Sequence, residues 1–182
     1  DRMRPVRIDG NDCLFTADIT DFFMSGSHLD LAVWSSRYAP SEIRDVVCAA
    51  ILFVLEHQYV EADPAVDDQA SVKVVHVGSG MGLHCSPEIA DAAFVVSAEL
   101  SFVLVDSIMS RFGIKMYSRY KDDVFGVPDR NNVNQFVTAW LDHRSHCRCP
   151  LIVNKIDMSI TSIPVLDLLI SLDFDKGCLS WR

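Results

Sequence analysis

A pair of adjacent aspartates, Asp122 and Asp123, lies between two short stretches with strand-like patterns. Residues 114–120 carry alternating apolar positions, and residues 124–127 form a short apolar run. This pattern predicts a strand, a tight turn that holds both aspartates, and a second strand. Like charges side by side repel, so the turn suits bound cations, and carboxylate oxygens are ligands that Mg²⁺ prefers. By itself, an acidic turn between two strands is also common as a purely structural feature.

A third carboxylate, Asp18, ends another apolar alternation over residues 13–19, which we expect to be a strand. Phosphoryl transfer with two metal ions needs carboxylates from separate segments, because the ions lie about 3.5–4 Å apart. We therefore expect Asp18 to lie beside Asp122. We also expect at least one carboxyl of the cluster to have a raised pKa. Taken alone, this segment equally fits a half-buried strand followed by an acidic turn.

A glycine-rich segment precedes a strong helix start. Ser86 is predicted to cap the helix, with Pro87 at its first position and Glu88 in its first turn. The loop lacks the lysine of a phosphate-binding P-loop and the spacing of a dinucleotide fingerprint. Its glycines would permit a ligand to approach the backbone closely, and they are Gly78, Gly80 and Gly82.

In this order, the three segments resemble motifs A, B and C of a reverse transcriptase palm, most closely those of Penelope-like retroelements. The matching residues of the second motif are Met81-Gly82, Ser86-Pro87 and Ala90. Those of the third are Arg119-Tyr120-Lys121-Asp122-Asp123-Val124-Phe125. A fourth stretch is similar to the one that leads into the primer grip of that family, and it comprises residues 163–170 and 177–180. The resemblance runs from about Cys13 to Trp181.

The resemblance implies a single α+β palm domain over residues 1–182, an antiparallel sheet with helices packed on one face. It implies an RNA-directed DNA polymerase that works on an RNA template, a DNA primer and dNTPs. Two Mg²⁺ or Mn²⁺ ions would be bound by Asp18, Asp122 and Asp123. The implied nucleotide and primer contacts are Phe23, which would exclude a ribose 2′-hydroxyl, together with Met81, Gly82, Ser86 and Tyr120. Most of the fingers and the thumb would lie outside this chain, so we expect the chain alone to be inactive.

Two features favour an alternative, a catalytically inactive retroelement-derived remnant or a nucleic-acid-binding scaffold. Lys121 stands where the family places a small or apolar residue, and the net charge is −9 although nucleic-acid binding draws on Lys and Arg. The intact set of three aspartates opposes this alternative. A viral RNA-dependent RNA polymerase shares the palm but usually has Gly before the aspartate pair, so Tyr120 and Lys121 disfavour it.

Composition sets the remaining limits. A length of 182 residues suits one domain, and 49% hydrophobic residues can supply a buried core. No apolar run of membrane-spanning length occurs, so we expect no membrane partner. The six cysteines lack the spacing of a disulfide framework. We therefore expect an intracellular chain with reduced cysteines, and a nuclear location.

The periodicity of the remaining chain predicts helices and strands in a palm-like order. Helices are expected over residues 41–59, 86–111 and 132–143, and strands over residues 72–77, 151–160, 165–174 and after the turn 175–177. Residues 143–149 hold two His and two Cys, but no second pair of ligands accompanies them. A polar helix end is favoured over a zinc site there.

Overall fold

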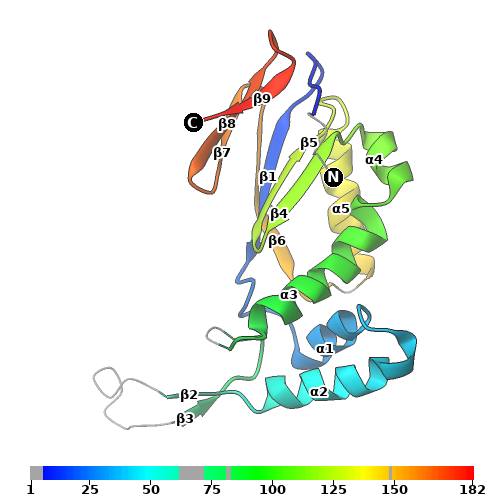
Figure 1. The fold of residues 1–182 in the computed structure, drawn as a ribbon, viewed down its shortest axis with the longest axis vertical. Helices are drawn as coiled ribbons and strands as arrows, with labels where there is room; N and C mark the ends of the chain where they lie inside the picture. The colour runs from blue at the N-terminus through cyan, green and yellow to red at the C-terminus, as the bar shows by residue number, and fades with distance from the viewer. Residues whose placement is uncertain (1–5, 62–71, 81–82, 148) are drawn as a thin grey trace. The chain divides into compact units, whose positions relative to one another are not determined.

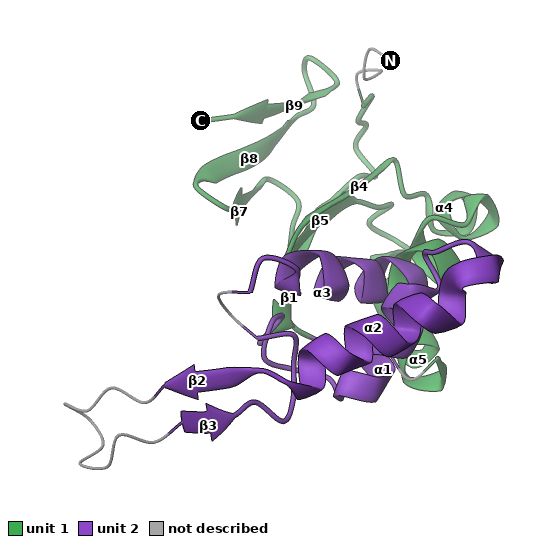
Figure 2. Ribbon diagram, turned by 60° about the horizontal axis from the view of Figure 1, so that its bottom comes forward, with its two compact units in different colours: residues 1–20, 98–147, 153–182 green, residues 21–97, 148–152 purple. Residues whose placement is uncertain are grey.

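The computed structural model describes residues 6–61, 72–80, 83–147 and 149–182 (Figure 1). The chain divides into two compact units (Figure 2). The first comprises residues 1–20, 98–147 and 153–182, and the second comprises residues 21–97 and 148–152. The expectation of one palm domain over residues 1–182 stays a prediction.

The centre of the first unit is a four-stranded sheet in the order β4-β5-β1-β6. Its strands are β1 (Leu14–Thr20), β4 (Met116–Tyr120), β5 (Asp123–Val127) and β6 (Ile152–Ser159). The central strand β5 pairs antiparallel with both β1 and β4. The predicted hairpin around the aspartate pair and the predicted strand before Asp18 are therefore confirmed.

Helices of the first unit cover one face of this sheet. The ring of Trp140 on α5 (Val133–His146) packs edge-on against Phe15 of β1 and Tyr117 of β4, with ring centroids 6.3 and 6.5 Å apart. Phe136 of the same helix contacts Phe112 of α4 (Asp106–Phe112). Trp140 and Phe136 are fully buried, so aromatic packing fixes α5 on the sheet. The expected arrangement, with helices on one face, is confirmed.

The opposite face of the sheet packs against a three-stranded sheet, β7-β8-β9. Its strands are β7 (Ser162–Val165), β8 (Leu168–Asp173) and β9 (Cys178–Trp181). The predicted strand over residues 165–174 is confirmed over β8 but begins later, because Val165 ends β7 and a turn precedes β8. Leu166 takes a left-handed φ of 52° in that turn, which reverses the chain. The shared apolar core comprises Ile8, Leu14, Phe125, Val127, Ile163 and Leu172.

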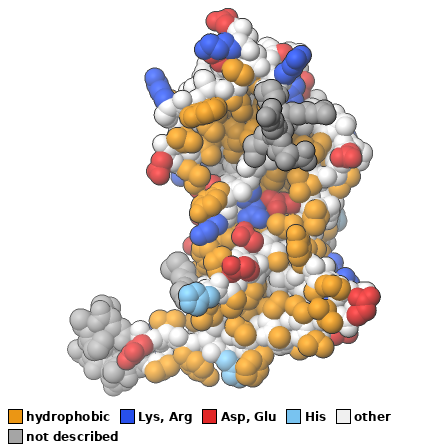
Figure 3. Space-filling model, in the orientation of Figure 1, with side chains coloured by type: hydrophobic (Ala, Val, Ile, Leu, Met, Phe, Trp, Pro, Cys, Tyr) orange, Lys and Arg blue, Asp and Glu red, His pale blue; other side chains and the backbone are white. Residues whose placement is uncertain are grey.

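The second unit contains α1 (His28–Ser36), η1 (Ser41–Ile43), α2 (Arg44–Glu56), the hairpin of β2 (Tyr59–Glu61) and β3 (Val72–Val74), and α3 (Ser86–Phe94). Helix α1 packs against both α2 and α3. Helix α2 confirms the predicted helix over residues 41–59, and Leu55 is its one buried residue. Hydrophobic side chains remain on the surface along α2 (Figure 3), among them Val46 and Phe53.

The prediction of one long helix over residues 86–111 is wrong. After α3 the chain continues as a π-helical segment, η2 (Val95–Val103), and α4 begins anew at Asp106. The wider turn is visible where the Leu104 amide donates to the carbonyl of Glu99, five residues earlier. Gly113 ends α4 with a left-handed φ of 61°, a conformation that glycine adopts readily at a helix C-terminus.

No single helix among the described residues is long and apolar enough to cross a membrane. One bent pair, Ser86–Val103 with Asp106–Phe112, meets the requirement by length and composition alone.

Candidate active site

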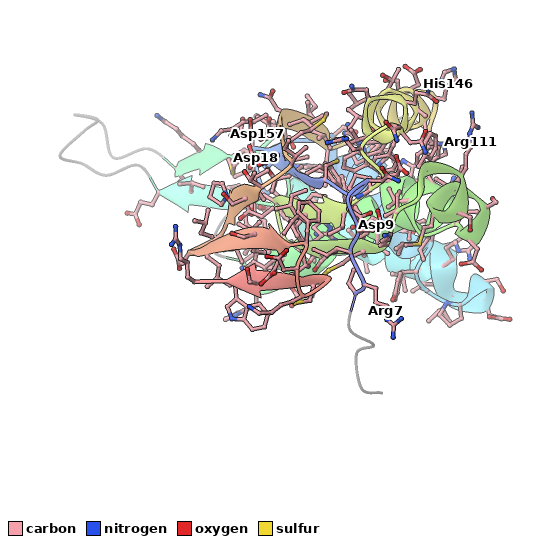
Figure 4. The ribbon with its side chains drawn as sticks, turned by 90° about the horizontal axis from the view of Figure 1, so that it is seen from above. Arg7, Asp9, Asp18, Arg111, His146 and Asp157 are labelled. Carbon is pink, nitrogen blue, oxygen red and sulfur yellow. The ribbon has the colours of Figure 1, made fainter. Side chains whose placement is uncertain are left out.

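The strand register brings two of the three predicted metal ligands together. Asp18 of β1 lies directly opposite Asp123 of β5. Directly opposed residues of an antiparallel pair have Cα atoms about 4.5–5.5 Å apart and side chains on the same face of the sheet. The Ile19 amide donates to the Asp122 carbonyl at 2.9 Å, which ties the third aspartate to the same strand. Figure 4 labels the side chain of Asp18.

Asp122 lies in a two-residue turn, and Asp123 begins β5. Tyr120 pairs with Asp123, so Lys121 and Asp122 form the loop of the hairpin. Lys121 has a φ of 54°, a left-handed conformation that is uncommon for a residue with a side chain. Its ammonium lies 5.6 Å from the centroid of the Tyr120 ring, within the range of a cation–π contact. The Tyr120 side chain is exposed on the face of the sheet that carries Asp18 and Asp123.

The electrostatics of the site follow from this crowding. Burial raises the pKa of the Asp123 carboxyl, and the charges of Asp122 and Asp18 raise it further. The cation of Lys155 on β6 opposes this effect and lowers the pKa of Asp123. The expected raised pKa is thus confirmed, although burial contributes more to it than repulsion does.

The donor chemistry fits a hard cation only in part. Within the described parts of the chain, no group of three or more His, Cys, Asp or Glu side chains is arranged to hold a metal ion. Asp18 and Asp123 do form a carboxylate pair on one face. Mg²⁺ is typically held by one or two carboxylates together with substrate phosphates, and this pair fits that role. Binding by all three aspartates stays a prediction.

The second unit holds Phe23 together with the glycine-rich loop. Gly78 has a φ of 79°, and a Cβ built on it would lie 2.5 Å from the Phe23 carbonyl oxygen. The Gly80 amide donates to that same oxygen at 2.9 Å. The close approach that Gly78 permits is therefore to the chain's own backbone, and not to a ligand as the sequence suggested.

Ser86 is another residue expected to contact nucleotide or primer. Ser86 is buried, and its hydroxyl donates to the Ser79 carbonyl. The prediction that Ser86 caps α3 is wrong, because Cys85 is the N-cap residue and no side chain caps the helix. Pro87 does lie in the first turn, as predicted. Met81 and Gly82 lie outside the described residues.

Sequence reasoning missed a buried network on the helix-covered face of the sheet. Glu99 accepts hydrogen bonds from the Tyr117 hydroxyl at 2.9 Å and from Arg119 Nε at 2.8 Å. Arg119 Nη1 donates in turn to the Lys121 carbonyl at 2.7 Å. Glu99 is the single charged residue of the apolar stretch 95–105, and that isolation is the signal that could have pointed to a buried partner.

No family model and no curated protein matches this chain. Solved structures with a similar fold do exist. Apo telomerase from Candida tropicalis truncated from its C-terminal domain is 13% identical, with a TM-score of 0.66, over 94% of this chain and 35% of that chain. Another structure of apo telomerase from Candida tropicalis is 10% identical, with a TM-score of 0.63, over 93% of this chain and 32% of that one.

This chain therefore spans about a third of the length of those telomerase chains. At such low identity the likeness shows a shared fold. It confirms the predicted α+β, palm-like fold, with antiparallel sheets and packed helices. Membership of the Penelope-like group in particular stays a prediction.

Proposed function

We propose that this chain is the palm of a retroelement reverse transcriptase, an enzyme that adds dNTPs to the 3′-hydroxyl of a DNA primer on an RNA template. The register that sets Asp18 opposite Asp123 carries the proposal, because it joins the aspartates of motifs A and C on one face. The similar fold of telomerase, a reverse-transcriptase-related enzyme, supports the coarse assignment. The ordered motifs described above support a Penelope-like retroelement as its source, and a nuclear location stays a prediction.

In this proposal, Asp18, Asp122 and Asp123 hold two Mg²⁺ or Mn²⁺ ions. When bound, the ions would lower the pKa of the primer hydroxyl and neutralise the leaving pyrophosphate. The chain itself supplies two carboxylates on paired strands, so their separation is fixed before a cation arrives. Since the pKa of Asp123 is raised, cation binding would compete with a proton at its carboxylate oxygen.

The residues outside the carboxylate pair would orient the substrates. Tyr120 is exposed on the face of the sheet that holds Asp18 and Asp123, where its ring is available to a primer or nucleotide. Phe23 would contact the sugar and exclude a 2′-hydroxyl. Met81, Gly82 and Ser86 would border the nucleotide. Because Ser86 donates to the Ser79 carbonyl, we expect its part to be indirect, through the shape of the glycine-rich loop.

A second candidate is a catalytically inactive remnant that serves as a nucleic-acid-binding scaffold. It is favoured by the lack of a three-ligand group among the described side chains and by the net charge of −9. Lys121 also places a cation next to the aspartate pair in the sequence.

Primer extension by the complete natural protein separates the two candidates. We expect it to extend a DNA primer on RNA with dNTPs and Mg²⁺, and we expect Asp122→Asn to lower the rate by about 100-fold or more, equivalent to about 2.7 kcal/mol. Asp142→Asn, the same change on an exposed position of α5, is the matched control. If the protein is inert and Lys121→Gly, a small residue that fits the left-handed φ of the turn, restores activity, the natural sequence is a decayed copy. If neither form extends a primer but both bind RNA, the scaffold is correct.

A further inference from the structure

Beneath the acidic turn, on the helix-covered face of the sheet, lies a buried ion pair. The side chains of Glu99 on η2 and Arg119 on β4 are only 6% and 8% exposed. Arg119 reaches the carboxylate with two nitrogens, Nε at 2.8 Å and Nη2 at 3.4 Å. The Tyr117 hydroxyl donates to the same carboxylate, and burial and the Glu99 charge both raise the pKa of that phenol. Tyr117 therefore stays protonated and acts as a donor.

Stability alone does not explain such a pair. Removing two charges from water costs free energy that their attraction often fails to recover, and apolar residues of similar volume are frequently as stable or more so. The best-documented benefit of a buried ion pair is a fixed geometry. Its remaining contacts indicate which geometry the pair fixes.

The remaining arm of Arg119 reaches the turn that carries the aspartates. Nη1 donates to the Lys121 carbonyl at 2.7 Å. Lys121 holds the left-handed φ of 54°, a conformation that non-glycine residues rarely keep without support from their surroundings. The carbonyl that accepts this bond belongs to the peptide between Lys121 and Asp122. Arg119 therefore connects the buried carboxylate of Glu99 directly to the peptide plane from which Asp122 extends.

We propose that Glu99 and Arg119 are positioning residues that hold the backbone of the Lys121–Asp122 turn, and through it the orientation of Asp122 and Asp123. The catalytic consequence rests on the proposed polymerase function, but the control of the turn does not. Only a guanidinium has enough donors in a fixed plane to bind a carboxylate with two nitrogens and a carbonyl with a third. An ammonium at this position cannot do both with the same geometry.

The test uses the triple variant Glu99→Leu, Tyr117→Phe and Arg119→Met in the complete natural protein. It removes both charges of the ion pair and the phenol hydroxyl together, so neither Glu99 nor Arg119 is left as a buried charge without the other. We expect the variant to fold, with the amides of residues 120–124 exchanging hydrogen at least about 10-fold faster and those of α5 unchanged. Loss of a residue that orients a metal ligand typically costs about 10–100-fold, so Mn²⁺ affinity and kcat should each fall by that factor. The KM for dNTP should change little.

Two further variants keep the proposal decidable. Arg119→Lys preserves the charge opposite Glu99 and should still give fast exchange at the turn, including when the triple variant fails to fold. Lys176→Met is the control, because it breaks an exposed ion pair with Asp173 in the same unit and should leave turn exchange unaltered. Unchanged exchange at residues 120–124 in both network variants would overturn the proposal. A wild-type protein that neither binds Mn²⁺ nor extends a primer would refute the proposed function, while the exchange data would still decide the positioning role.

Discussion

Replacing Asp123 by Asn should stabilise the protein in the absence of divalent cations. The carboxylate of Asp123 lies opposite that of Asp18 and follows Asp122 in sequence, and its pKa is raised by burial and by both of these charges. A group whose charged form is disfavoured in the folded state destabilises that state whenever it is ionised. Asparagine keeps the shape of the side chain and removes the charge.

The geometry of the strand pair sets the size of the effect. The Cβ atoms of directly opposed residues lie about 5 Å apart. If the charges are separated by the same distance, Coulomb's law gives about 1 kcal/mol at the dielectric constant of water and about 3 kcal/mol at an effective value of 20. Asp18 and Asp123 are partly exposed, so solvent screening favours the lower figure. We expect Asp123→Asn to gain about 1 kcal/mol at pH 7 and low salt, which raises Tm by about 2–4 °C in a protein of this size.

The pH dependence has a definite sign. Because the folded-state pKa of Asp123 is raised above its ordinary value of 3.8, the folded wild-type protein binds a proton more tightly than the unfolded chain. Wild-type stability should therefore decline as the pH rises from that value through the raised pKa. The advantage of Asp123→Asn should appear across the same window and vanish in more acidic solution.

Thermal unfolding across a pH series, with and without Mn²⁺, measures this effect. At ten times its Kd the ion should stabilise the wild-type protein by about 1.4 kcal/mol and the variant by clearly less, since one ligand is lost. Asp142→Asn should change stability by less than about 0.5 kcal/mol under all conditions. Without metal at pH 7, Asp123→Asn and Asp142→Asn should change the wild-type Tm by different amounts. Equal changes of Tm for these two variants, or a loss of stability in Asp123→Asn, would refute the electrostatic reasoning.

Three other changes give independent tests. Gly78→Ala should lower the free energy of unfolding in urea by about 2–4 kcal/mol, because the new Cβ would clash with the Phe23 backbone and Gly78 has a positive φ. Gly10→Ala is the control and should be nearly neutral, because its Cβ would meet no atom within 4 Å. Trp140→Ala should cost about 3–5 kcal/mol, because its ring is fully buried between α5 and the sheet. Phe23→Ala in the complete natural protein should keep dNTP incorporation and raise ribonucleotide incorporation. The measurement is the ratio of kcat/KM for the two kinds of nucleotide, and an unchanged ratio would show that Phe23 does not contact the sugar.

Elements with a clear local period were predictable from the sequence. Alternating polarity identified β1 and the hairpin of β4 and β5, and Gly113 marked the end of α4. Helix α1 was missed although Ser27 accepts from the Asp30 amide as its N-cap, a Ser-x-x-Asp signal that was present in the sequence. The π-helical segment η2 and the break after it were not predictable, because an apolar run continues through both and shows no change of period.

The types of the candidate metal ligands were predictable from the sequence, but the pairing that brings them together was not. An aspartate pair and a distant aspartate indicate hard-cation ligands, but the register that opposes Asp18 to Asp123 rather than to Asp122 depends on how β1 and β5 pair. The Glu99–Arg119 pair joins residues 20 positions apart across a helix and a strand. Local periodicity cannot identify such a partner, whereas the isolation of one acid in an apolar segment can raise the question of what it binds.

The two-residue period of the strands explains why a buried ion pair and an exposed acidic site occur side by side in one hairpin. Along β4, Tyr117 and Arg119 point to the face that α5 covers, while Tyr120 points to the face that carries Asp18 and Asp123. The carboxylates can therefore remain open to solvent and substrate while their backbone is anchored from the opposite side. A one-residue shift of β4 against β5 would put Tyr117 and Arg119 on the open face and leave the Glu99 carboxylate buried without its partner. Burial of that unpaired charge would cost several kcal/mol, so the requirement of the site also selects the correct register of the sheet.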